Sequence, residues 1–369
     1  GVGLAYKLAA ALYGSESGEV ERYLDLVAVG TVADLAPLSG ENRSLVRRGL
    51  ELLRRQERQG LVSLMAVANL APARLNATHI GYSIGPRLNA AGRMTTAEKA
   101  LELLTTWDVL KAGELAQVLD NQNRERQKLT QAIQEQAEII AQADDPGGLL
   151  LFAASENFNH GVVGLAASRL SERYYRPAIV ATIDEELTRG SCRSIPEFHI
   201  TDALDQCADL LVKHGGHAAA AGFTVPNERM EELKRRLKAL AQEALADCDL
   251  RPVLRADLEL PLSDLKPAIL EDLKVLEPTG QSNPRAVFVS RNLRPTRVNT
   301  VGNEGQHLKL DVTDGRLWYP AIAFQQGHWA AEMPERIDIM YYYEVNEFNG
   351  RSTLQLNVID LKPAGLGDT

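Results

Sequence analysis

The chain has 369 residues, 45% of them hydrophobic, so two or three domains with substantial cores are expected. A formal charge of −9 argues against a protein that coats nucleic acid with its whole surface, although it leaves room for a local basic groove. The sequence has no apolar run of about 18 residues and no signal-peptide pattern, which predicts a soluble, cytoplasmic protein without a membrane partner. Three cysteines without CxxC spacing indicate neither a zinc site nor a disulfide framework.

The first part of the chain predicts the end of an α/β domain. An apolar helix is expected at 2–12, directly after Gly1, and we interpret this as a start in the middle of a domain. The run YLDLVAVG at 23–30 is short, apolar and ended by glycine, which predicts a buried strand, and a helix is predicted at 41–56. A strand followed by a helix favours the last part of a doubly wound sheet.

A long connector and two further domains follow. The polar segment 120–143 carries an apolar stripe at helical spacing, which predicts an amphipathic helix between domains. The run DDPGG ends it, and strands at 149–154, 177–183 and 220–223 with a helix at 227–246 predict a second α/β domain. After Cys248, short alternating segments such as HLKLDV, IDIMYYYEV and TLQLNVI predict an antiparallel barrel of the OB type at 250–363.

Asp34 is a candidate metal ligand in the segment GTVADLAPL. It would follow the carboxyl end of the predicted strand, where ligands bind in open α/β sheets. The alternative, that Asp34 caps the following helix, is the more frequent arrangement for an isolated aspartate.

The segment GPRLNAAGR places Arg87 and Arg93 around Asn89 in what we expect to be a glycine-rich loop. Arginine forks match phosphate oxygens, and glycines allow close approach of the backbone. The same residues fit equally well a turn that leads into a helix, with both arginines exposed to solvent and no phosphate contact.

The second domain contains three elements suited to anions. A loop containing His160 leads into a helix of small residues, whose amino terminus would attract anions. The run RGSCRS supplies Ser191, Arg193 and Ser194 for a phosphate, and HGGHAAAAGF places His217 behind Gly215 and Gly216 as a hydrogen-bond donor. Alternatively, the small-residue helix only packs tightly, Arg193 forms a surface ion pair, and His217 is a hydrogen-bonded core histidine. Three such elements within about seventy residues favour a phosphate-binding domain.

In the predicted barrel, basic and aromatic residues occur together. The arginines are Arg285, Arg291, Arg294 and Arg297, and the aromatic residues are Phe288, Trp318, Phe324 and Tyr341 to Tyr343. OB barrels bind single strands by stacking bases on rings and contacting phosphates with cations, so Arg291 and Arg294 are candidate DNA contacts. Aromatic residues that fill the barrel and arginines that are merely solvated explain the pattern equally well.

These motifs resemble the RecJ family of single-strand-specific exonucleases, within the DHH phosphoesterase superfamily. The matching segments, in family order, are GTVADLAPL, ENRSLVRRGL, GPRLNAAGR, LDNQNRERQ, GVVGLAASRL, RGSCRSIPEFHI and GGHAAAAGF, and LEPTGQSNPRAVF resembles the segment that precedes the family's OB domain. The resemblance implies a partial DHH phosphoesterase domain at 1–105, a connecting helix at 106–145, a DHH-associated domain at 146–248 and an OB domain at 249–369.

The resemblance also implies an activity and residue roles. It implies 5′-to-3′ hydrolysis of single-stranded DNA with Mn²⁺ or Mg²⁺ in a two-metal site, in recombination and repair. Asp34 matches a metal-binding carboxylate, Ser191 and Arg193 match the pocket for the 5′-phosphate, and His217 matches a histidine near the scissile phosphate. Arg87, Asn89 and Arg93 belong to the loop that meets the DNA backbone. A RecQ-type helicase and a single-strand-binding protein are expected partners besides DNA.

The sequence departs from the family pattern at three places. It has no Asp-His-His triplet and no DxD pair, which we interpret as truncation, so the chain as given is expected to be inactive. His160 stands one position after the family's usual histidine and is the candidate to replace it. Thr279 and Ser282 stand where Phe and Gly are usual before the barrel. A non-catalytic DNA-binding or replication scaffold, and a nuclease for oligoribonucleotides or a cyclic dinucleotide, are the competing hypotheses. The additional barrel favours a longer polymer over a small substrate.

Overall fold

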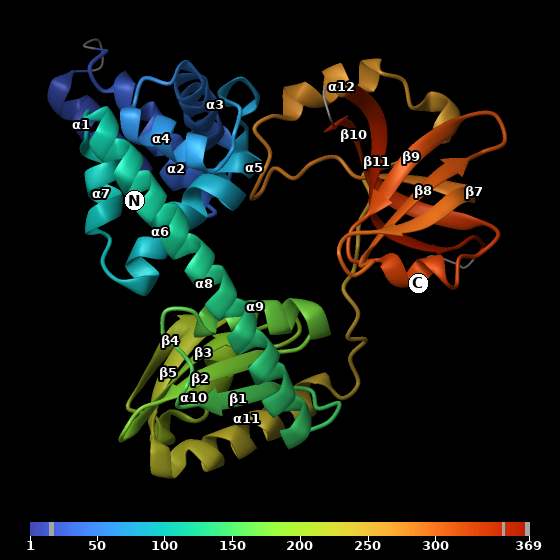
Figure 1. The fold of residues 1–369 in the computed structure, drawn as a ribbon. Helices are drawn as coiled ribbons and strands as arrows, with labels where there is room; N and C mark the ends of the chain where they lie inside the picture. The colour runs from blue at the N-terminus through green and yellow to red at the C-terminus, as the bar shows by residue number, and fades with distance from the viewer. Residues whose placement is uncertain (15–17, 349–350, 366–369) are drawn as a thin grey trace. The chain divides into compact units, whose positions relative to one another are not determined.

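The computed structural model describes residues 1–14, 18–348 and 351–365. The chain divides into two compact units. Figure 1 traces the chain from blue at the amino terminus to red at the carboxyl terminus. The first unit comprises Gly1–Leu52, Asn76–Ile80 and Leu254–Thr369, and the second comprises Leu53–Leu75 and Gly81–Val253. No helix in the described part of the chain is both long and apolar enough to cross a membrane.

Every element described before residue 151 is helical. The helices are α1 (Val2–Tyr13), α2 (Leu24–Ala33), α3 (Gly40–Arg55), α4 (Gln59–Val67), α5 (Ala77–His79), α6 (Gly85–Met94), α7 (Glu98–Thr105) and α8 (Val109–Asp144), with a π-helical turn at Ile80–Ile84 between α5 and α6. The strand predicted at 23–30 is therefore wrong, because this segment forms most of α2. Apart from the buried Asp25, its residues are apolar on every side of the helix and mostly buried, so the sequence has no periodicity that separates a buried helix from a buried strand.

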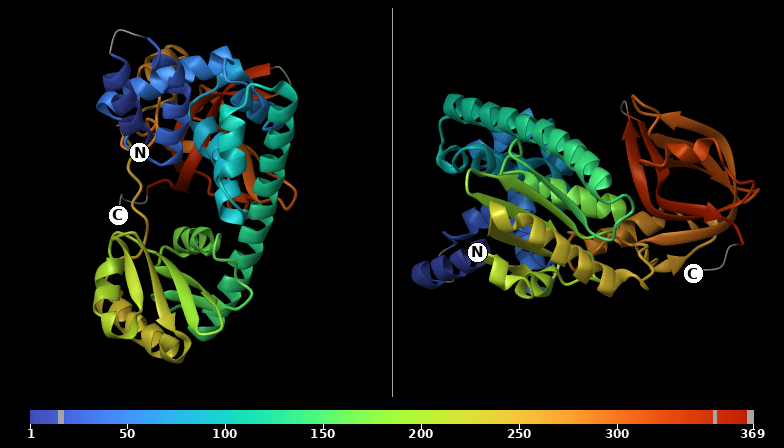
Figure 2. Two further views of the ribbon diagram at one scale, coloured as in Figure 1. Left: turned by 90° about the vertical axis from the view of Figure 1, so that its left-hand side faces the viewer. Right: turned by 90° about the horizontal axis from the view of Figure 1, so that it is seen from below.

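The connecting helix is confirmed and is longer than the predicted amphipathic segment. Figure 2 shows α8 as one unbroken helix. Asp108 caps its amino terminus by accepting hydrogen bonds from the N–H groups of Leu110 and Lys111. The predicted apolar stripe packs in a buried cluster with β1, β2 and α9, and Ile133 and Ala137 are fully enclosed there.

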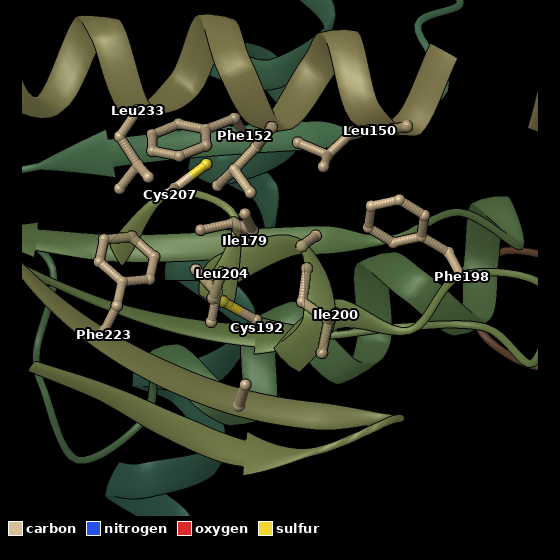
Figure 3. Packing of buried hydrophobic residues seen from close by; sticks show 14 of the residues in the cluster. Leu150, Phe152, Ile179, Cys192, Phe198, Ile200, Leu204, Cys207, Phe223 and Leu233 are labelled. Carbon is tan, nitrogen blue, oxygen red and sulfur yellow. The ribbon is translucent and has the colours of Figure 1, made fainter. Parts of the chain in front are cut away.

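The second unit contains a five-stranded sheet in the order β1-β2-β3-β5-β4. The elements are β1 (Leu151–Ser155), α9 (Val163–Tyr174), β2 (Ala178–Ile183), β3 (Leu187–Arg193), α10 (Ile200–Asp205), β4 (Lys213–His217), β5 (Ala220–Pro226) and α11 (Met230–Leu245). Strands β1 and β2 are parallel and the other pairs are antiparallel. Helices α8 and α9 cover one face, whereas α10 and α11 cover the other, where Phe152, Cys192 and Phe223 are buried (Figure 3).

The first unit ends in a closed barrel, which confirms the predicted OB type. Its elements are β6 (Leu258–Glu259), α12 (Ala268–Leu273), β7 (Phe288–Val301), β8 (His307–Thr313), β9 (Trp318–Ala323), β10 (Ile337–Phe348) and β11 (Arg351–Pro363). The sheet order is β10-β11-β9-β8-β7-β6, and an additional pairing of β10 with β7 closes it. The expected fold class is thus observed from β1 to the end of the barrel.

The loop before β7 is held by the helix α3 through main-chain contacts within the first unit. Arg43 donates to the carbonyl of Val275 (2.6 Å), and Arg47 donates to the carbonyl of Glu277 (2.6 Å). The N–H of Leu38 donates to the carbonyl of Gln281 (2.7 Å). Ser282 has a φ of 61°, in the left-handed region that glycine adopts most easily.

Candidate nucleic-acid interface

Strand β3 directs Ser191 and Arg193 toward α9. Their neighbour Cys192 points into the core on the other face, because side chains alternate along a strand. Arg193 donates to the carbonyl of Cys192 (2.8 Å) and to the hydroxyl of Ser191 (3.3 Å). A Cβ at Gly164, in the first turn of α9, would lie 2.9 Å from Ser191 Oγ and 3.2 Å from Arg193 Nη2. Glycine therefore lets the amino terminus of α9 come close to both functional groups, and this terminus itself favours an anion.

Three further arginines lie around this point, and we call Arg93, Arg126, Arg169 and Arg193 the arginine cluster. Arg93 donates to the carbonyl of Gly161 (3.2 Å), Arg126 to Asn123 Oδ1 (2.9 Å) and Arg169 to Gln134 Oε1 (3.3 Å). All these acceptors are neutral. Among the residues that the structure describes, none of the four arginines forms an ion pair with a carboxylate.

The arginine cluster has uncompensated positive charge. Burial lowers the pKa of Arg126, and the nearby charges of Arg93 and Arg169 lower it further. Burial also lowers the pKa of Arg193, and the nearby positive charge of Arg93 lowers it further. The Nε atom of Arg126 is buried without a hydrogen-bond partner in the described structure. A bound anion would relieve both the mutual repulsion and the unsatisfied donor.

Arg126 and Arg169 were missed in the sequence analysis. Arg126 lies in the motif LDNQNRERQ, and its partner Asn123 is buried although α8 is otherwise polar there. A buried amide next to arginines on the inner side of an amphipathic helix is the signal that could have identified this position.

His217 lies in register with Arg193. In the sheet, Arg193 pairs with Ala220, which pairs with His217, so the three side chains point to the same face. Two strand spacings separate His217 from Arg193, a distance of about 10 Å. The neighbouring row contains Ser191, Gly222 and Gly215, and its two glycines leave the sheet bare beside the serine hydroxyl. His217 is exposed, so the alternative of a core histidine is excluded.

Gly216, Ser194 and His160 are the remaining candidate residues of this domain, and each has different neighbours. Gly216 lies on the opposite face from His217, where a Cβ would come within 2.3 Å of the carbonyl oxygen of Ala220. Ser194 donates its hydroxyl to the carbonyl of Phe198 (2.6 Å), which fixes the turn after β3. His160 is exposed and lies 3.1 Å from Asp184 Oδ1.

The segment GPRLNAAGR is the helix α6, which corrects the prediction of a loop. Pro86 stands in the first turn of α6, directly after the π-helical turn Ile80–Ile84. Asn89 and Arg93 are exposed on this helix, whereas Arg87 is mostly buried. Arg87 donates to the carboxylate of Asp120 on α8 (2.9 Å), so it has a structural role that the sequence did not indicate.

Asp34 ends α2 and is exposed, so the assumed position after a strand is wrong. It does not cap the next helix either, because α3 begins at Gly40. Asp34 lines a cavity of about 420 Å³ with Lys7, Thr31 and Glu41. Over the described ranges, no three His, Cys, Asp or Glu side chains lie close enough together to hold a metal ion. The residues present therefore do not fit a two-metal site by themselves.

The basic and aromatic residues of the barrel have three kinds of surroundings: some lie in the core, some form ion pairs, and some are exposed on the surface. Tyr341, Tyr343 and Phe288 are buried in the barrel core. Arg291 pairs with Glu259 (2.8 Å) and Asp338 (3.2 Å), whereas Arg294 is exposed.

The outer face of β8 and β9 carries a further set of candidates. Trp318 is 60% exposed and Phe324 is 54% exposed. His307 packs edge-on against Phe324, with ring centroids 5.2 Å apart. Lys309 is exposed and pairs with Ile322 between these rings. Because the second and third strands of OB barrels form the usual binding face, Trp318, Lys309 and Phe324 form a candidate platform.

Comparison with known proteins identifies the class. Residues 147–244 match the family model described as the DHHA1 domain, and residues 256–360 match the RecJ OB domain. The chain thus joins a DHHA1 domain to an OB barrel. It is 36% identical over 98% of its length to the single-stranded-DNA-specific exonuclease RecJ of Bacillus subtilis, and 35% identical over 98% to that of Dickeya dadantii. The chain belongs to the RecJ family.

Solved structures agree with this assignment. The RecJ of Thermus thermophilus in complex with Mg²⁺ superposes with a TM-score of 0.82 at 31% identity, covering 94% of this chain and 53% of that protein. The same protein in complex with Mn²⁺ gives a TM-score of 0.81. The chain spans 46% of the length of the Bacillus relative and 67% of the Dickeya relative.

Proposed function

We propose that this chain binds the 5′ end of single-stranded DNA for 5′-to-3′ exonucleolytic hydrolysis. The observation that carries the proposal is the arginine cluster without carboxylate partners beside Ser191 and the amino terminus of α9. A terminal phosphate carries about −1.5 to −2 charges at pH 7, more than a phosphodiester, so the cluster should prefer it. The names of the relatives, single-stranded-DNA-specific exonucleases, support the same substrate.

The direct test is a binding comparison. Fluorescence anisotropy with two oligonucleotides of one sequence, one with a 5′-phosphate and one with a 5′-hydroxyl, should show tighter binding of the phosphorylated strand by the complete chain. Equal affinity for both would contradict a terminal-phosphate site.

The proposed residue roles follow from position. The arginine cluster and Ser191 hold the terminal phosphate, and His217 donates to the next phosphate across the bare sheet between them. Asn89, His160 and Ser194 belong to the same sequence motifs, and we propose no specific DNA contact for them. Gly215 and Gly216 lie in β4, the strand over which the DNA would pass. Asp34 is proposed as a single metal ligand. From the resemblance we also propose domain boundaries at 105, 145 and 248. We further propose a cytoplasmic location, with a RecQ-type helicase and a single-strand-binding protein as partners.

We expect residues 1–369 alone to release no nucleotides from 5′-phosphorylated single-stranded DNA in Mn²⁺ or Mg²⁺. One exposed carboxylate cannot hold the metal pair that such hydrolysis needs, and the described residues form no group of three or more His, Cys, Asp or Glu side chains that could hold a metal ion. Binding of the same DNA by the same preparation is the control for folding. Release of nucleotides that EDTA abolishes would show that the chain supplies its own metal site, and would also count against a purely non-catalytic scaffold.

For the barrel, replacing Trp318 with alanine should weaken binding of a long single strand about tenfold, because stacking of one base contributes about 1–3 kcal/mol. Lys309→Ala should instead lower the salt dependence, by about 0.7 in the log–log slope for one lost phosphate contact. Anisotropy titrations at several salt concentrations separate the two effects. Arg291→Ala serves as a comparison, since its ion pairs leave it less free to contact DNA than Arg294. Unchanged affinity and slope in both platform variants would remove β8 and β9 from the DNA path.

A further inference from the structure

Tyr82 lies in the π-helical turn directly before α6, the helix that carries Asn89 and Arg93. Its side chain is 82% exposed, and the described part of the structure gives it no hydrogen bond, ion pair or ring contact. We propose that Tyr82 stacks on a base of the bound single strand and so guides the strand toward the arginine cluster. This inference rests on the proposed DNA-binding function, and it adds a contact to a base near the arginine cluster, where that function proposes contacts to phosphates alone.

The backbone at Tyr82 has a special geometry with an identifiable cause. Ile80–Ile84 form a π-helical turn inside a helix that otherwise continues to Met94. Pro86 has no N–H for the carbonyl of Tyr82, four residues earlier, and its ring would crowd that carbonyl in a regular α-helix. The wider turn avoids this conflict, and Arg87 donates a hydrogen bond from its side chain to the carbonyl of Ser83 (2.8 Å). Turns of this kind occur frequently at functional sites.

The position of Tyr82 relates it to the arginine cluster. Tyr82, Asn89 and Arg93 lie in order along one continuous helical run, with Tyr82 in the π-helical turn and the other two on α6. All three are exposed. An α-helical rise of 1.5 Å per residue sets an upper bound of about 16 Å on the axial distance between Tyr82 and Arg93, which corresponds to a few nucleotides of a single strand. Arg93 in turn donates to the carbonyl of Gly161, just before α9, so the helical run that starts near Tyr82 ends beside the phosphate site.

The chemistry suits a base and not a phosphate. A phenol ring has no positive charge, and its exposed face can stack on any nucleobase, because every base has a π surface. Stacking is insensitive to sequence, which is what an exonuclease that moves along a strand requires. The hydroxyl group is not needed for stacking, so phenylalanine should replace tyrosine without loss.

The test uses the complete chain and a 5′-phosphorylated oligonucleotide in fluorescence anisotropy. Tyr82→Ala should weaken binding about 5- to 150-fold, which corresponds to about 1–3 kcal/mol, whereas Tyr82→Phe should stay within about twofold of the unchanged chain. Trp107→Ala is the matched control, since Trp107 is 72% exposed in the same unit but lies between α7 and α8. It should not change the affinity.

A second measurement distinguishes stacking from any other effect. A series of oligonucleotides, each with one abasic site, should include one position at which Tyr82→Ala no longer weakens binding. At that position, 2-aminopurine fluorescence should be quenched by the unchanged chain and not by Tyr82→Ala. Loss of affinity that persists at every abasic position, or no loss in Tyr82→Ala while Arg193→Ala does weaken binding, would overturn the role of Tyr82 and leave the proposed function intact. No DNA binding by the unchanged chain would overturn both.

Discussion

Replacing Arg193 with alanine should weaken binding of a 5′-phosphorylated single strand about 10- to 100-fold and affect a 5′-hydroxyl strand less. Hydrogen bonds to charged groups contribute about 1.5–3 kcal/mol, and each 1.4 kcal/mol is about tenfold in affinity. Arg193 is held in place by the carbonyl of Cys192 and by Ser191, so its fork is oriented before the phosphate arrives. The difference between the two strands should shrink in Arg193→Ala, because the extra charge of the terminal phosphate loses its strongest partner.

Arg235→Ala is the matched control for the loss of one positive charge. Arg235 lies on α11, which covers the opposite face of the sheet, and it pairs with Glu232. Anisotropy titrations of both variants with both strands give four affinities from one set of experiments. An equal loss on both strands in Arg193→Ala would make Arg193 a general backbone contact instead of a terminal-phosphate ligand.

The second large effect should be on stability. Replacing Arg87 with alanine should lower the free energy of unfolding by about 3 kcal/mol, because the carboxylate of Asp120 is fully buried and loses the more buried of its two arginine partners. Arg87 also bonds to the π-helical turn, so its loss should loosen α6 against α8. Urea unfolding followed by circular dichroism measures the change, and hydrogen exchange should locate it in α6 and α8.

Arg124→Ala provides the comparison, since Arg124 contacts the other oxygen of the same carboxylate (2.8 Å) but is 66% exposed. Exposed ion pairs contribute about 1 kcal/mol or less, so this variant should be much less destabilised. Equal destabilisation of the two variants would mean that burial of Arg87 does not decide the strength of its pair.

The sequence was sufficient to predict a helix or strand where one face of the element is buried and the other is exposed. The barrel strands alternate apolar and polar residues, and the connecting helix has an apolar stripe, so both were predicted correctly. The strand predicted at 23–30 was wrong because the residues of this segment, apart from Asp25, are apolar on all sides of the helix. The segment 85–93 is a helix in spite of two glycines, because Gly85 and Gly92 lie near its ends and Pro86 suits its first turn.

The site was only partly predictable, for a different reason. Ser191 and Arg193 lie two residues apart in one motif, so sequence alone could relate them. Arg126 and Arg169 meet them only after α8 and α9 pack on one face of the sheet. His217 reaches its place through strand pairing, two strands away from Arg193. Such distances depend on register and packing, which no local pattern contains.

The contact between α3 and the loop before the barrel uses carbonyl groups alone at Val275 and Glu277. Any residue at these two positions presents the same oxygen, so substitutions there leave both hydrogen bonds available. What the contact requires is the path of the main chain, including the left-handed conformation at Ser282. The docking of this loop on the helix therefore depends on the backbone conformation and not on which side chains stand at Val275 and Glu277.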